Sequence, residues 1–114
     1  MFKLKRQQKE ALRLQAICDF EDRVLEHVER CFPDRLRSLG EATVREVIHQ
    51  GVGRAATYGI YLERDVCKFI DLMLVLGMHF DRELAWASEI LGAPLPKEPS
   101  VKLGRLFERA MEAP

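Results

Sequence analysis

The stretch LERDVCKFIDLMLVLG, residues 62–77, decides the fold of this chain. Its apolar side chains recur at steps of three and four residues, which is the period of an α-helix and not the alternation of a strand. They cover most sides of that helix, and such a helix is normally surrounded by others. The sequence therefore predicts an all-α fold with a central apolar helix at residues 62–77. The spacing is set by Val66, Phe69, Ile70, Met73 and Leu74.

Four further helices are predicted around this central one, within a single domain. The same apolar spacing recurs along the chain, and prolines and glycines interrupt it between the helices. Asp81 is expected to cap the fourth helix, and Gly59 to take the left-handed backbone after the second. The prediction is a helical domain at 1–92 with helices at 4–32, 41–58, 62–77 and 81–91, a turn at 33–39, a proline-rich linker at 93–99 and a short amphipathic helix at 100–112.

The segment GVGRAA, residues 51–56, matches the G-x-G-x-x-A fingerprint of a dinucleotide-binding loop. That loop requires a strand before it and a helix after it. Here the segment lies inside the predicted helix 41–58, and no strand is predicted anywhere in the chain. We therefore interpret it as a seam of small residues that lets another helix approach closely. The small residues are Gly51, Gly53, Ala55 and Ala56.

Asp71 is the most informative charged residue, because it lies in mid-helix within the apolar stretch FIDLMLVLGM. An unpaired buried carboxylate is strongly unfavourable, so the side chain must face water or have a partner. Arg54, Arg64 and Arg82 are the candidate partners. We predict a structural ion pair between Asp71 and Arg54.

His27 and Cys31 lie four residues apart on one predicted helix, a spacing that can supply two zinc ligands. The other histidines and cysteines form no second such pair, and the sequence shows no local signature of nucleophilic catalysis. We therefore expect no metal site, no cofactor and no enzymatic activity. The residues without a second pair are His49, His79, Cys18 and Cys67.

Charge and composition limit the class of partner. Eighteen basic and eighteen acidic residues cancel, so the chain lacks the positive field that drives binding to nucleic acid. Its longest apolar run, residues 72–78, is far shorter than the roughly 20 residues of a membrane span. Three cysteines without a C-x-x-C pair are typical of a reduced, cytoplasmic protein. We expect no nucleic acid and no membrane as partners.

A protein partner is the remaining class, and two features suggest its binding surface. A short helix after a proline-rich linker cannot bury its apolar stripe alone, so the stripe must dock on this domain or on another protein. Tryptophan is frequent among the anchor residues of interfaces. We predict a partner surface made of Trp86, Leu103, Leu106 and Phe107.

Four segments between Cys31 and Gly92 carry a family resemblance. They are CFPDRLRSLG, GVGRAATYGI, ERDVCKFIDLMLVLGMHFD and WASEILG. Their pattern is an aromatic residue before Gly-Ile, then Glu-x-Asp-Val, then Gly-x-x-Phe-Asp and Trp-Ala. In this pattern the chain resembles small bacterial helical proteins encoded beside type VI secretion effectors and their dedicated chaperones.

The resemblance implies a non-enzymatic adaptor or co-chaperone. Such a protein would bind an effector, or the chaperone of that effector, and assist its loading onto the secretion spike. Two alternatives stay open from the residues alone. One is an immunity protein that neutralises a toxin, and the other is a nucleic-acid-binding regulator that uses the basic N-terminal arm. A homodimer is also left open. The arm carries Lys3, Lys5, Arg6, Lys9 and Arg13.

Overall fold

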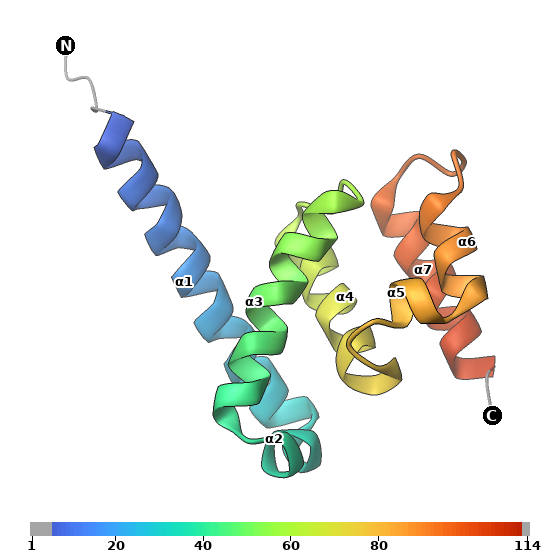
Figure 1. Ribbon diagram of the computed structural model, residues 1–114, viewed down its shortest axis with the longest axis horizontal. Helices are drawn as coiled ribbons and strands as arrows, with labels where there is room; N and C mark the ends of the chain where they lie inside the picture. Colours follow the sequence, from blue (N-terminus) through green and yellow to red (C-terminus); the bar gives the residue numbers. More distant parts are fainter. Residues whose placement is uncertain (1–5, 113–114) are drawn as a thin grey trace.

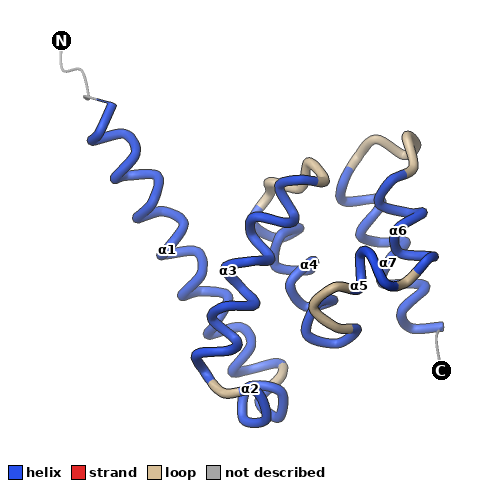
Figure 2. Tube along the Cα trace, in the orientation of Figure 1, coloured by secondary structure: helices blue, strands red, loops and turns tan. Residues whose placement is uncertain are grey.

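Helices form nearly the whole of the chain (Figures 1 and 2). The computed structural model describes residues 6–112, and it describes side chains from Arg13 onward. No strand occurs in this part of the chain. The helices are α1 (Arg6–Cys31), α2 (Pro33–Leu39), α3 (Glu41–Thr57), α4 (Glu63–Leu76), α5 (Phe80–Glu83), α6 (Ala85–Gly92) and α7 (Pro99–Glu112).

The helices form a flat array that measures 57 × 38 × 20 Å. Helix α1 lies along one side, and its first half extends beyond the rest of the molecule (Figure 1). Helices α3 and α4 occupy the middle, and α5, α6 and α7 gather on the side opposite α1 (Figure 1). The two ends of the array therefore differ, because one is a closed group of short helices and the other is a projecting helix.

Helix α4 is the centre of the packing, as the sequence predicts. It contacts α1, α3, α5 and α7. Phe69 and Ile70 are fully buried, and Phe69 packs against Phe80 with ring centroids 5.2 Å apart. Burial of each such side chain contributes about 1.5–3 kcal/mol to folding. The apolar character of residues 62–77 thus has its physical explanation in the four neighbours of α4.

The structure has seven helices in the described residues where the sequence predicts five. The segment predicted as a turn is the helix α2, in which Pro33 takes the first position, where a missing N–H costs nothing. The helix predicted at 81–91 is instead two helices, because Leu84 is extended, with φ −93° and ψ 114°. This break lets α5 pack on α4 while α6 packs on α7. The predicted start of the first helix at residue 4 lies outside the described residues.

Asp81 does not act as the predicted helix cap. It lies within α5, almost completely buried, and its carboxylate binds the side chains of Arg54 and Tyr58. Gly59 does take the predicted left-handed backbone after α3, with φ 76°. The conformation of a glycine after a helix is set by neighbouring residues of the chain. The position of a buried carboxylate depends instead on partners that are distant in the sequence.

The predicted seam of small residues holds for one face of α3. A Cβ atom added to Gly51 would lie 2.6 Å from Cγ1 of Ile70 on α4, which is closer than atoms can pack. Ala55, one turn further on, is completely buried. Gly53 faces open space, because two residues along a helix correspond to about 200° of rotation. Among the small residues of the segment, Gly51 and Ala55 therefore make the close contact and Gly53 does not.

Candidate functional site

The apolar stripe of the C-terminal helix is part of the core and not a free surface. Leu103 and Leu106 are fully buried. Ser100 fastens the start of α7 by donating a hydrogen bond of 2.7 Å to the buried carboxylate of Asp65. Lys102 donates to two backbone carbonyls at the end of α6 and just after it. This helix docks on its own domain, so the predicted use of Leu103 and Leu106 as a partner surface is wrong.

Trp86 and Phe107 are half-buried at the edge of the same group of helices. The guanidinium of Arg109 on α7 lies 5.7 Å from the centroid of the Trp86 ring, within the range of a cation–π contact. Both rings pack against the core. They therefore help to hold α6 and α7 together, which is a structural explanation for two residues that the sequence assigned to a partner.

Arg54 and Asp71 do not form the predicted ion pair. Arg54 points toward the loop between α4 and α5, where it donates to the carbonyl of Met78 and lies 3.2 Å from the Asp81 carboxylate. Tyr58 donates a hydrogen bond of 2.6 Å to the other oxygen of Asp81. Burial and this bond to Asp81 raise the pKa of Tyr58 to about 12. The arginine and the tyrosine thus satisfy the buried Asp81 carboxylate, which the sequence assigned to a helix cap.

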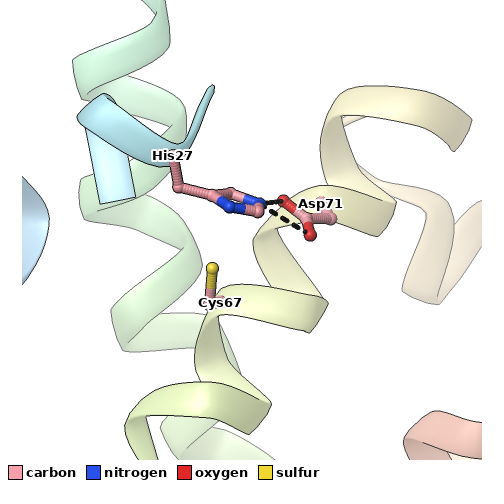
Figure 3. A group of neighbouring side chains, drawn as sticks. All are labelled: His27, Cys67 and Asp71. Carbon is pink, nitrogen blue, oxygen red and sulfur yellow. Dashed lines mark hydrogen bonds and ion pairs between the residues drawn. The ribbon is translucent and has the colours of Figure 1, made fainter. Parts of the chain in front are cut away.

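Asp71 finds its partner on α1 instead. Nε2 of His27 lies 3.0 and 3.1 Å from the two carboxylate oxygens (Figure 3). The His27 and Asp71 side chains are 25% and 15% exposed. Burial raises the pKa of Asp71, and the bond from His27 opposes that shift. The requirement that Asp71 have a partner is therefore met, by a histidine and not by an arginine.

Cys67 brings a thiol into the same place. Its sulfur points toward the His27 ring, beside Asp71 (Figure 3). One ligand atom from each of His27, Cys67 and Asp71 lies within 4.8 Å of the others. Sγ of Cys31 lies 3.6 Å from Nδ1 of His27, on the other edge of the ring. We call His27, Cys67 and Asp71 the α1/α4 cluster.

The sequence does carry a signal for the α1/α4 cluster, but it is visible only when aspartates are considered together with histidines and cysteines. Cys67 and Asp71 lie four residues apart on α4, just as His27 and Cys31 do on α1. A carboxylate can complete such a pair as well as a second thiol or imidazole can. Burial and the nearby Asp71 carboxylate raise the pKa of Cys67 to about 11.

A hollow of about 240 Å³ is the second notable feature, and it lies beside the projecting half of α1. Apolar side chains from α1, α3 and α4 make most of its wall. Leu14 stands nearby on α1 and is 62% exposed, and Tyr61, at the turn between α3 and α4, is 74% exposed. We call this hollow the α1 groove. Its wall includes Ile17, Phe20, Val52 and Val66, with the exposed charges of Arg13 and Glu63.

Comparison of the chain with protein-family models, with curated proteins and with solved structures finds no match. Within residues 6–112, no helix combines the length and the apolar character that crossing a membrane requires.

Proposed function

We propose that this protein is a non-enzymatic adaptor that binds an amphipathic helix of a partner protein in the α1 groove. The observation that carries the proposal is the uncovered apolar wall beside the first half of α1. The second half of that helix packs into the core through three buried residues, Val24, Leu25 and Val28. Nearer its start, the Leu14 side chain is 62% exposed, and the side chains of Ile17 and Phe20 are half-buried. The helix is therefore incompletely covered between residues 13 and 20.

A docked helix suits this geometry. Helical segments in water gain most of their stability from packing of an apolar face, and the apolar side chains at residues 13–20 of α1 are packed only in part. A partner helix that places an apolar stripe against Ile17, Phe20 and Val66 would complete that packing. Arg13 supplies an exposed positive charge at the groove, which favours a partner helix with an acidic residue beside its stripe, whereas Glu63 already pairs with Arg23 at 2.9 Å.

For the identity of the partner we rely on the resemblance described in the sequence analysis. Residues 31–92 resemble proteins encoded with type VI secretion effectors, so the proposed partner is such an effector or its dedicated chaperone. The adaptor would assist the loading of that effector onto the secretion spike. The proposal places the protein in the bacterial cytoplasm, where its three free thiols, Cys18, Cys31 and Cys67, would stay reduced.

The test is co-expression with the effector and the chaperone encoded beside it, followed by affinity measurement with the purified proteins. We expect a stable complex that survives moderate salt. Ile17→Asp places a charge in the groove and should weaken binding at least about tenfold, as loss of an interface anchor does. Cys18→Asp is the matched control, because it adds the same charge at the neighbouring exposed position.

Three results would contradict the proposal. One is a chain that forms no complex with either protein. Another is equal weakening by Ile17→Asp and Cys18→Asp, which would place the interface elsewhere. The third is binding to nucleic acid that falls steeply with salt, which would favour a regulator instead.

A further inference from the structure

The α1/α4 cluster joins two helices that are remote in sequence, and three kinds of ligand atom meet in it. His27 contributes an imidazole from α1, and Cys67 and Asp71 contribute a thiol and a carboxylate from α4 (Figure 3). The three ligand atoms lie within 4.8 Å of one another. Side chains this close either pair only among themselves or share an ion.

We propose that His27, Cys67 and Asp71 bind a zinc ion between α1 and α4. Zinc takes nitrogen, sulfur and oxygen ligands at about 2.0–2.3 Å, so that the ligand atoms of a tetrahedral site lie about 3.5 Å apart. Nε2 of His27 and Oδ1 of Asp71 are 3.0 Å apart without an ion. The Cys67 sulfur lies within 4.8 Å of both atoms, so a zinc ion would replace the hydrogen bond between His27 and Asp71 and draw the sulfur closer.

The backbone supports this arrangement. His27 and Asp71 are held by regular helix on both sides, and Cys67 lies one turn before Asp71 on the same face of α4. Cys31 lies one turn after His27, and its sulfur is 3.6 Å from Nδ1, the ring nitrogen that does not face Asp71. A partner at the second nitrogen fixes the orientation of a ligating imidazole. Cys31 thus positions the His27 ring in the proposed site.

The donor set selects the metal. Calcium and magnesium prefer oxygen ligands alone, whereas one thiolate, one imidazole and one carboxylate suit zinc. Cys31 is exposed and the His27 side chain is 25% exposed, so the site reaches the surface. A zinc ion held by three protein ligands keeps a fourth position for water or another ligand. The ion would cross-link α1 to α4, and this inference does not depend on the proposed adaptor function.

The test is titration of the reduced, metal-free chain with Co²⁺, and then displacement of Co²⁺ by Zn²⁺. We expect one ion per chain, the visible absorption of tetrahedral cobalt, and a thiolate-to-cobalt charge-transfer band in the near ultraviolet. Cys67→Ser should remove the charge-transfer band and weaken Zn²⁺ binding at least about tenfold, which corresponds to about 1.4 kcal/mol. Cys18→Ser is the matched control and should leave both unchanged, because Cys18 lies outside the cluster.

Circular dichroism checks that each variant keeps its helices. If Cys67→Ser fails to fold, Asp71→Asn takes its place, and it should keep the charge-transfer band while weakening Zn²⁺ binding. The proposal is overturned if Co²⁺ produces no charge-transfer band. It is also overturned if the band survives in Cys67→Ser, or if Cys18→Ser removes it. A rise of the melting temperature with Zn²⁺ in the natural chain, absent in Cys67→Ser, would support the cross-link between the helices.

Discussion

His27 and Asp71 lie 44 residues apart in the sequence, yet Nε2 of the histidine is 3.0 Å from a carboxylate oxygen of the aspartate. This contact joins α1 to the central helix α4 at a half-buried position. It satisfies the carboxylate that sequence reasoning assigned to Arg54, and it brings His27 beside Cys67. This contact is therefore one of several that hold α1 against the rest of the molecule, and it joins two members of the candidate metal site.

Replacement of His27 by alanine should destabilise the protein by about 1–3 kcal/mol, because it leaves the half-buried Asp71 carboxylate without its partner. Urea unfolding of the metal-free chain measures the effect. Gln15→Ala is the control, since Gln15 pairs with Asp19 on the exposed face of the same helix, and it should change stability by less than about 0.5 kcal/mol. Equal effects of the two substitutions would show that the contact with Asp71 adds nothing to folding.

Arg54→Ala should have a larger effect, about 3–5 kcal/mol, because it leaves the completely buried side chain of Asp81 without its opposite charge. Arg37→Ala is the matched control, since Arg37 pairs with Asp34 at the surface, and it should cost less than about 0.5 kcal/mol. The measurement is again urea unfolding. Similar urea midpoints for the two variants would contradict this prediction, and would mean that the hydrogen bond from Tyr58 is enough to stabilise the buried Asp81 carboxylate.

Gly51→Ala and Gly53→Ala should change stability in opposite directions, although both replace a glycine within α3. The new Cβ at position 51 meets the fully buried Ile70 at 2.6 Å, and such overpacking costs about 1–3 kcal/mol. The Cβ at position 53 meets open space, so the helix should gain up to about 1 kcal/mol from the better helix former. Thermal unfolding compares them, and a gain in both variants would contradict the close crossing of α3 and α4.

Tyr58 should make the protein less stable at alkaline pH. Its pKa is raised from 10.0 to about 12 in the folded chain, so the folded state favours the protonated phenol. The stabilising contribution is complete below pH 10 and is lost as the pH rises through about 12. Tyr58→Phe removes this contribution. The free energy of unfolding of this variant should therefore fall less between pH 10 and about pH 12 than that of the natural chain. Equal pH profiles in urea unfolding would refute the prediction.

Leu106→Ala should cost about 2–5 kcal/mol, because it empties a fully buried position between α7 and the core. Met111→Ala, at the exposed end of the same helix, should cost less than about 0.5 kcal/mol. Calorimetric melting distinguishes them. A small effect of Leu106→Ala would reopen the interpretation of this stripe as a surface for another protein.

Much of the fold follows from local features of the sequence. The apolar period at residues 62–77 predicts α4 within one residue at each end, and Gly59 takes the backbone expected after α3. Gly51 and Ala55 mark a close helix crossing. These features depend on residues within a few positions of one another, where helix geometry alone determines which side chains share a face.

The tertiary structure decided the partners of the charged and apolar side chains. Asp71 binds His27 and not Arg54, and the stripe at Leu106 docks on its own domain. The proximity of His27 to Cys67 also could not be predicted from the sequence. Periodicity shows that a helix has an apolar face or a buried charge, but not which other helix lies opposite. That depends on how all the helices pack together, because each buried group must find its partner across distances of many residues.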